Sequence, residues 1–533
     1  MSTTLKTERP LFEGADWDFA TVQKCHDAIQ EIALGEMGLD VYPNQIEVIG
    51  TEQMLDAYSS IGMPLFYKHW SFGKHFARDE TMYRAGMRGL AYEIVINSNP
   101  CISYIMEENT AMMQTLVIAH AAFGHNHFFK NNYLFKEWTD ASGIIDYLEF
   151  ARDYVLECEE KYGETAVETL LDAGHALMSH GVFKYPRKKP TNLRTEEQRA
   201  RKRREHEDEI FNDLWRTVPR GEVLKTTTQT EEEKRRALLQ LPHENILYFL
   251  EKFAPRLKPW QRELLRIVRN VAQYFYPQGQ TKVMNEGCAT FVHYTIMNRL
   301  HEKGLLTDGA FAEFLVSHTN VVFQPNYDAQ HYSGINPYAL GFAMMQDIQG
   351  IVEGTRTDLP GNPPRDPDQL NEDKKHFPNI ACKGDAMAVL RDIWANYRDE
   401  SFILQFLSPR LIRHFRLFHV SDDDQETSLR VENIQDSIGY RAIKHQLAQQ
   451  YDIGWGTPDI QILDVDLVGD RKLIVCHRVL NKILLDEQDA KIVLQHLADL
   501  WGYGVVMKQV GAEIGTVLEE NTVQPRPGIY DTQ

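Results

Sequence analysis

Two short segments of the chain concentrate side chains of the types that bind metal ions. The first holds His120 and His125, and the second holds Glu286 and His293. Both segments lie within apolar stretches that predict buried helices. Burying imidazoles and a carboxylate is costly unless another group compensates them, and a metal ion commonly does so. The sequence therefore predicts a metal centre that holds a divalent ion, either zinc or iron.

The spacing of these residues limits how they can share one ion. Glu286 and His293 are nearly two helical turns apart, so they face the same side but lie about 10 Å apart along the axis. His120 and His125 are one residue too far apart for a regular helix. They reach one ion only through a π-bulge or where a helix ends at Gly124. The ligands must therefore converge from different helices.

A second group of candidates lies in a predicted pair of helices farther along the chain. Asp172 and His175 have the i, i+3 spacing of carboxylate and histidine that helical di-metal sites use. Glu159 lies on the preceding helix, and a partly buried carboxylate near metal-bound water can act as a general base. We therefore predict His175 as a further metal ligand and Glu159 as the catalytic proton carrier.

The same residue types are compatible with two alternatives to this metal centre. A single buried histidine is usually a satisfied core residue, so a polar network with bound water is the first alternative. The second is a carboxylate-bridged di-metal oxidase built from Glu159, Asp172, His175, Glu286 and His293. The sequence has no phosphate-binding loop, no GxSxG motif and no HExxH motif, which disfavours P-loop, serine-hydrolase and standard zinc-peptidase functions.

The composition is that of a globular protein with more than one lobe. The chain has 533 residues, of which 43% are hydrophobic and 25% charged, and one core does not usually grow to this size. The net charge of −19 disfavours binding to nucleic acid or to an anionic membrane. The six cysteines show no CxxC pairs, and no run is apolar enough for a leader or a membrane span. We therefore expect a cytoplasmic protein.

The hydrophobic pattern predicts an α+β fold that is predominantly helical. A mixed α/β N-terminal part at 1–135 leads through a histidine-bearing helix into a helical core at 136–415, and a small α/β domain follows at 416–533. Within the core, a charged excursion is expected at about 184–240 and a proline-rich loop at 355–377.

Individual elements can be predicted within these parts. Strands are expected at 45–49 and 91–97, and the second of them leads into a central helix at 112–129. The last part should contain a β-hairpin at 460–477 and a helix at 490–500.

Several runs of sequence resemble one protein family. They lie at 42–49, 69–74, 92–101, 124–126, 128–135, 284–287 and 333–342. On these runs the chain resembles the SpoVR family (stage V sporulation protein R-like, with YcgB-like members) over nearly its whole length. The resemblance implies a bacterial cytoplasmic protein linked to spore-cortex formation or, in other members, to stationary-phase and starvation responses. It also implies a functional link to a PrkA-type serine kinase and a YhbH/YeaH-like protein, but no reaction.

The segment at 285–290 also resembles the Asn-Glu-Gly-x-Ala helix of gluzincin peptidases, in which the glutamate binds zinc. The resemblance implies that Glu286 is a zinc ligand and that His120 and His125 take the place of the peptidase histidines. It further implies that the strand at 91–97 is the edge strand along which a substrate binds.

Two departures from these patterns are visible. The general-base glutamate that follows the first histidine of the peptidases is Ala121 here, and Cys288 stands where the SpoVR family usually has tryptophan. The first departure disfavours ordinary peptidase chemistry.

We predict a metal-dependent hydrolase that acts on an amide or peptide-type bond. The alternative is a non-enzymatic scaffold or regulator in the kinase pathway, with the histidines as structural residues.

Overall fold

The computed structural model describes most of the chain. It covers residues 9–526, with gaps at 60–66, 185–238, 240, 357–366, 422–429, 434–438, 467–468, 480–483 and 512–516 and partial gaps within 72–92, 327–333 and 453–456. The contacts between residues divide the chain into two compact units. Unit 1 comprises 1–157 and 274–456, and unit 2 comprises 158–273 and 457–533. The predicted charged excursion and the middle of the proline-rich loop lie outside the described residues. The structure confirms the α+β, predominantly helical fold class.

Unit 1 contains a three-stranded sheet beside the histidine-bearing helix. Its strands are β1 (Asn44–Ile49), β2 (Glu93–Ile96) and β3 (Cys101–Met106), in the order β1-β3-β2. β1 runs parallel to β3, whereas β2 runs antiparallel to it. Both predicted strands are therefore confirmed within the described residues. Among those residues β2 pairs on one side only, so it is an edge strand of this sheet.

The predicted central helix is present, but it is not α-helical throughout. It consists of α4 (Ala111–Ile118), the π-helical segment η2 (Ala119–His125) and α5 (Asn126–Asn131). Thr110 begins it as an N-cap, because its side chain accepts a hydrogen bond from the Met113 N–H at 3.2 Å. A π-helical turn changes the angular spacing of side chains, and such turns often occur at functional sites.

Small residues bring three helices of unit 1 unusually close together. α13 (Lys282–Glu302) packs against α15 (Pro337–Glu353) and against η2. A Cβ atom on Gly287 would lie 2.6 Å from the Cα of Gly341, and one on Gly124 would lie 2.6 Å from the Cα of Ala289. No side chain fits in these contacts. The glycines therefore set the distance between Glu286 on α13 and the histidines on η2.

The amino end of α13 is capped by a residue that is distant in sequence. Its own N-cap residue, Thr281, makes no side-chain cap. Instead, the Val283 and Met284 N–H groups each donate to a carboxylate oxygen of Asp399 at 2.8 Å. Asp399 is the first residue of α18 (Asp399–Phe406). Burial raises the pKa of Asp399 to about 7, and the two backbone hydrogen bonds only partly oppose this.

A buried ion network connects α15 to two other helices of unit 1. The Arg356 guanidinium follows α15 and binds Asp347 at 2.9 Å and Asp373 at 2.6 Å. Asp373 lies on α16 (Pro367–His376), and Arg410 of α19 (Pro409–His414) binds the second oxygen of Asp347 at 3.0 Å. The side chains of Arg356 and both aspartates are 1–2% exposed. These charges therefore satisfy one another out of contact with water.

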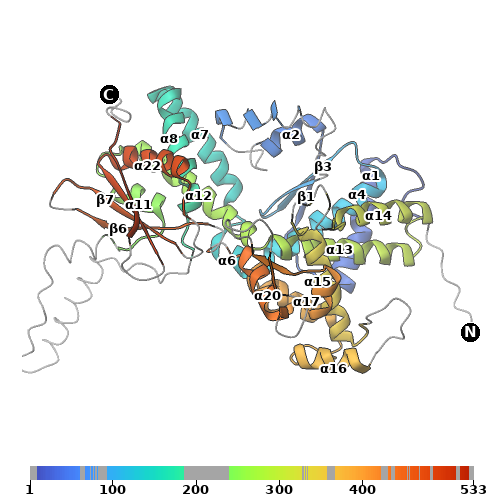
Figure 1. The fold of residues 1–533 in the computed structure, drawn as a ribbon. Helices are drawn as coiled ribbons and strands as arrows, with labels where there is room; N and C mark the ends of the chain where they lie inside the picture. The colour runs from blue at the N-terminus through green and yellow to red at the C-terminus, as the bar shows by residue number, and fades with distance from the viewer. Residues whose placement is uncertain are drawn as a thin grey trace, which may run out of the picture. The chain divides into compact units, whose positions relative to one another are not determined.

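The remaining described elements of unit 1 surround these helices (Figure 1). They are α1 (Phe19–Gln30), η1 (Glu31–Glu36), α2 (Thr51–Ser59), α6 (Tyr133–Trp138), α14 (Asp308–Val321), α17 (Ala386–Asn396), β4 (His419–Ser421), β5 (Arg430–Asn433) and α20 (Gly439–Gln450). Two long helices, α7 (Ile144–Tyr162) and α12 (Pro259–Gln280), have residues in both units.

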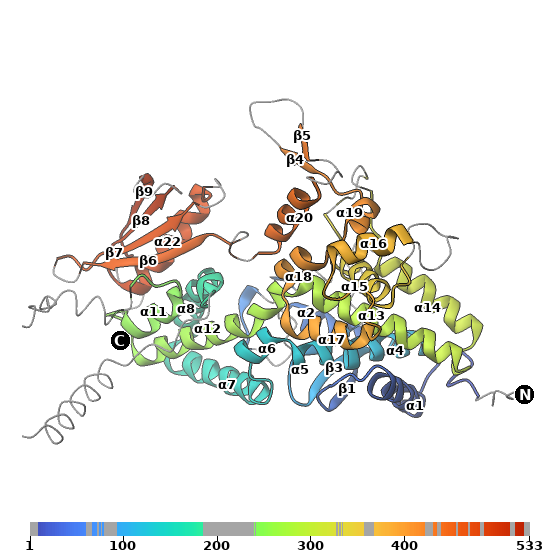
Figure 2. The same ribbon diagram turned by 90° about the horizontal axis from the view of Figure 1, so that it is seen from below.

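Unit 2 is a sheet with helices packed beside it (Figures 1 and 2). The strands β6 (Asp459–Val465), β7 (Leu473–Arg478), β8 (Val505–Val510) and β9 (Val517–Val523) lie in sequence order. β6 and β7 form the predicted hairpin, and α22 (Glu487–Trp501) is the predicted helix that crosses over to the parallel strand β8. The helices α8 (Glu164–Ala176), η3 (Met178–His180) and α11 (Ile246–Phe253) are further described elements of this unit.

The contacts divide the chain differently from the expected boundaries at 135 and 415. Residues 158–273 belong with the C-terminal sheet rather than with the helical core. Two contacts account for this grouping: α22 packs against α8, and His243 forms a β-bridge with Ile462 of β6. No described helix is both long and apolar enough to cross a membrane.

Candidate metal centre

Four side chains from three elements of unit 1 lie close together. Glu93, His120 and His125 each offer one ligand atom, and these atoms lie within 4.8 Å of one another. The Oε2 atom of Glu286 lies 3.8 Å from His120 Nε2 and 3.6 Å from His125 Nε2. Glu93 Oε1 lies 3.7 Å from His120 Nε2. Three predicted ligands, His120, His125 and Glu286, are thus brought together, and Glu93 joins them from β2.

The π-helical turn is the reason that two histidines five residues apart meet. Both lie on η2, where each turn holds more residues than in an α-helix. The ring centroids of His120 and His125 are 4.6 Å apart, and their planes are nearly perpendicular at 87°. Both Nε2 atoms therefore face Glu286. Of the two geometries that the sequence allows, the structure has the π-turn.

The separations within the cluster fit a metal ion. Zinc binds imidazole nitrogen and carboxylate oxygen at about 2.0–2.2 Å, which places tetrahedral ligand atoms about 3.4 Å apart. The observed separations of 3.6 and 3.8 Å exceed this value by a few tenths of an ångström. The Oε2 atom of Glu286 is buried and accepts no hydrogen bond from the described residues. A buried oxygen with unused lone pairs between two imidazoles is a fitting cation ligand.

The electrostatics of the cluster shift the pKa values of its two carboxylates in opposite directions. Burial by itself raises the pKa of Glu286, but His125 and His120 outweigh it, so that the net pKa is lowered. Burial raises the pKa of Glu93 against the attraction of His120, and repulsion by Glu286 adds to the rise. A carboxylate with a lowered pKa, such as Glu286, suits a metal ligand, and one with a raised pKa, such as Glu93, suits a proton carrier.

The two histidines also differ from each other. Burial lowers the pKa of His125 to about 4, so its imidazole is neutral at pH 7 and can bind a metal. Burial acts on His120 in the same direction, but Glu286 and Glu93 raise its pKa overall. The side chains of Glu93 and Glu286 are 20% and 18% exposed, so the cluster is not sealed from solvent.

Each histidine of the cluster is held through its other ring nitrogen. His125 Nδ1 lies 3.0 Å from the Oδ1 atom of Asn285. Since that oxygen only accepts, we assign the proton to Nδ1, which leaves the Nε2 lone pair directed at Glu286. His120 Nδ1 lies 2.9 Å from His293 Nδ1. Second partners of this kind orient metal-binding histidines in many proteins.

His293 therefore lies behind His120 rather than among the converging ligand atoms. Its second nitrogen, Nε2, lies 3.0 Å from His318 Nδ1, so both of its ring nitrogens face other imidazoles. Burial lowers the pKa of His293 well below its usual value and lowers that of His318 to about 4. The three rings therefore form a chain, in which His120 Nδ1 meets His293 Nδ1 and His293 Nε2 meets His318 Nδ1.

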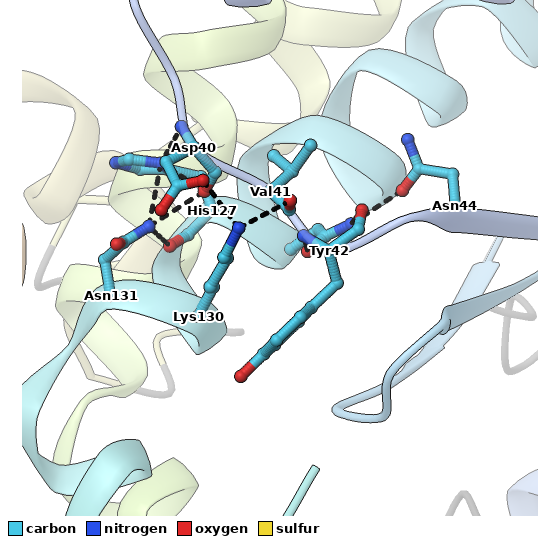
Figure 3. Close-up of polar contacts among 8 residues, drawn as sticks. Asp40, Val41, Tyr42, Asn44, His127, Lys130 and Asn131 are labelled. Carbon is cyan, nitrogen blue, oxygen red and sulfur yellow. Dashed lines mark hydrogen bonds and ion pairs between the residues drawn. The ribbon is translucent and has the colours of Figure 1, made fainter. Parts of the chain in front are cut away.

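A further histidine of the first segment, His127, belongs to a separate network of polar contacts (Figure 3). Its Nδ1 atom lies 2.9 Å from the Asp40 carbonyl oxygen, and the Asn131 side chain donates to the same oxygen at 2.8 Å. Lys130 binds the Asp40 carboxylate at 2.5 Å and the Val41 carbonyl at 2.9 Å. These bonds tie α5 to the chain that enters β1.

Three further hydrogen bonds in the same network involve Asn126, the residue directly after η2. Its side chain accepts from the Tyr42 N–H at 2.8 Å and donates to the Tyr42 carbonyl at 2.9 Å and to Asn44 at 2.6 Å. Lys130 also lies over the Tyr42 ring at 5.5 Å. The carboxyl end of η2 is thereby fixed to the sheet that carries Glu93.

Comparisons with known proteins identify the family. The model of the SpoVR like protein family matches residues 16–455, and that of the SpoVR-like C-terminal domain matches residues 458–512. The chain belongs to the SpoVR family. It is 51% identical over 518 residues to the uncharacterized protein YcgB of Escherichia coli (strain K12), and this match covers 97% of each chain. No solved structure matches this SpoVR protein.

Two predicted site residues lie outside the cluster of this SpoVR protein. Glu159 on α7 and His175 on α8 belong to unit 2, whereas every member of the cluster belongs to unit 1. Among the described residues, Glu93, His120 and His125 form a group whose potential ligand atoms lie within 4.8 Å of one another, and Glu286 lies beside both histidines of this group. The di-metal alternative combines residues of both units, and neither unit alone assembles it.

Sequence reasoning missed Glu93 and His318. Glu93 had a usable signal, because it is a lone carboxylate in an apolar strand that precedes the histidine-bearing helix. His318 had none, since it lies on α14 without a recognisable motif around it. Cys288, the departure from the family pattern, is fully buried, and burial raises the pKa of its thiol well above the usual value. Its thiol is accordingly protonated at neutral pH, so it is a poor metal ligand in this state.

Proposed function

We propose that this SpoVR protein is a metal-dependent hydrolase that acts on an amide or peptide-type bond. His120, His125 and Glu286 would hold a zinc or iron ion. The observation that carries the proposal is the convergence of two histidine Nε2 atoms on the otherwise unbonded Glu286 Oε2 at 3.6–3.8 Å. A bound ion of this kind supplies a Lewis acid and lowers the pKa of a water molecule.

Glu93 is the proton carrier in this proposal, in place of Glu159. Its carboxylate lies next to His120, and its raised pKa brings it closer to neutrality, where a general acid or base works best. In peptidases of the gluzincin type, the general base is the glutamate that follows the first histidine, and this position is Ala121 here. Glu93 of β2 would supply that function instead.

The edge strand β2 gives the substrate a place to bind. Glu93 is its first residue, and β2 pairs only with β3 among the described residues. An extended peptide can add to such an edge through backbone hydrogen bonds. This arrangement supports a peptide or another amide chain as the substrate.

Metal content tests the proposal directly. The purified protein should contain about one equivalent of zinc or iron per chain. Glu93→Gln should keep this metal but lose cleavage of unstructured peptides by about 100-fold or more, as expected for the loss of a general base. A content below about a tenth of an equivalent, with a melting temperature that does not change when zinc is added, would favour the buried polar network over the metal centre.

The histidine chain leads to a separate prediction. His293→Phe should weaken metal binding by about 10- to 100-fold, because His120 loses the partner that fixes its tautomer. Phenylalanine keeps the ring contact that His293 makes with Phe314. Metal affinity can be measured by competition with a chromophoric chelator, and His445→Phe, on the exposed surface of α20, is the matched control. Equal affinities for His293→Phe and the control would contradict this role of the chain.

The cellular role is proposed from the family relation. We propose action in the cytoplasm during sporulation or in stationary-phase and starvation responses, linked to a PrkA-type serine kinase and a YhbH/YeaH-like protein. A scaffold in that pathway would need the fold but not the metal. A variant that lacks metal yet retains its cellular activity would therefore favour the scaffold.

A further inference from the structure

A large cavity lies in unit 1 and shares no residue with the metal centre. Its volume is about 1190 Å³, and it is bounded by the chain after α14, by α15, by the end of α19 and by α20. Figure 2 shows these four helices in the same part of unit 1. Binding sites for small organic molecules commonly measure about 300–1,000 Å³. The cavity therefore has room for an organic ligand.

Aromatic side chains are exposed around this cavity. Phe323 is 63% exposed, Tyr332 41% and Phe418 37%, and all three line it. Large apolar rings are normally buried, and a group of exposed ones marks a surface that binds something. Rigid aromatic faces at a cavity suit a flat or aromatic ligand.

An arginine with a strained backbone lines the same cavity. The chain leaves α19 through a Schellman turn, in which Leu417 N–H donates to Ile412 O at 3.0 Å and Arg416 N–H to Arg413 O at 3.1 Å. Arg416 occupies the left-handed position of this turn with φ 51°, where glycine is favoured. Among the described residues its guanidinium has no ion pair or hydrogen bond. Strain of this kind is typically kept where a side chain has a function.

The polar lining of the cavity favours a negative charge. Its described residues include no aspartate or glutamate, although acidic residues outnumber basic ones by 76 to 57 in the chain. They do include Arg416 and the side chains of Gln346 and Gln450, which can donate hydrogen bonds. We propose that this cavity binds an organic anion with an aromatic or flat apolar body. Arg416 would bind the anionic group, and the aromatic rings would bind the body.

Two dyes that differ in charge test the proposal. The full-length protein should bind the anion 1-anilinonaphthalene-8-sulfonate at one site, and Phe418→Ala should weaken both this dye and the neutral N-phenyl-1-naphthylamine. Arg416→Gln should weaken the anionic dye by about tenfold or more, the usual effect of losing a charged hydrogen bond, but not the neutral dye. Lys24→Gln, which removes an exposed cation from α1, is the matched control and should change neither.

Arg416→Gly separates binding from folding. Glycine relieves the left-handed strain, so this variant should melt at a higher temperature than the parent and still lose the anionic dye. Three results would overturn the proposal: no binding of the anionic dye by the parent protein, equal binding by Arg416→Gly, or an equal loss in the Lys24→Gln control.

Discussion

Replacing Glu286 with glutamine should abolish tight metal binding and leave the chain folded. Glutamine has the same shape but no charge, and it offers a metal only a weak carbonyl ligand. Removing a residue that hydrogen-bonds to a metal ligand typically weakens metal affinity by about 10- to 100-fold. Removing the ligand itself should therefore weaken metal affinity by more than about 100-fold. Burial disfavours the charge of Glu286, but His125 and His120 outweigh it and lower its pKa, so loss of the charge should cost some stability while the unchanged shape of the side chain keeps the packing.

Elemental analysis and calorimetric titration with zinc measure this effect. Glu52→Gln is the matched control, because Glu52 is an exposed glutamate on α2 outside the cluster. Circular dichroism would show whether the helices persist in both variants. Retention of a full equivalent of metal by Glu286→Gln would show that the ion, if any, is held elsewhere.

Replacing Arg356 with alanine should cause a large loss of stability. The variant leaves Asp347 and Asp373 buried without their shared cation, and breaking a buried pair in this way costs about 3–5 kcal/mol. Because Arg356 follows α15, the loss should also loosen the helix that packs on α13. The free energy of unfolding in urea measures the change.

Arg410→Ala is the control for this prediction. Its side chain is 35% exposed, and its ion pair with Asp347 reaches the surface, so its removal should cost far less, at most about 1 kcal/mol. A loss of at most about 1 kcal/mol for Arg356→Ala as well would mean that the network acts as a surface ion pair and not as a buried one.

The ligand types of the candidate site could be predicted from the sequence because they lie in short, unusual segments. Imidazoles and a carboxylate within apolar runs were enough to identify His120, His125 and Glu286. The five-residue spacing of the two histidines even required a π-turn or a helix end, and η2 is such a turn. Strand and helix periodicity likewise predicted β1, β2, α22 and the β6–β7 hairpin.

Long-range pairings account for what the sequence did not reveal. Glu93 joins the cluster only because β2 pairs antiparallel with β3, and His318 joins the imidazole chain only because α14 packs beside α13. The grouping of residues 158–273 with the C-terminal sheet depends on contacts between α8 and α22. Periodicity reports which face of an element is buried, but not which partner buries it.

The cap on α13 has a consequence for protein synthesis. All four proposed metal-site residues have left the ribosome before Asp399 is made, since the last of them is residue 286. Until that aspartate arrives, the first turn of α13 lacks the acceptor for two of its N–H groups. A truncated nascent chain should therefore carry every ligand and still fail to retain metal, which places metal loading late in translation or after it.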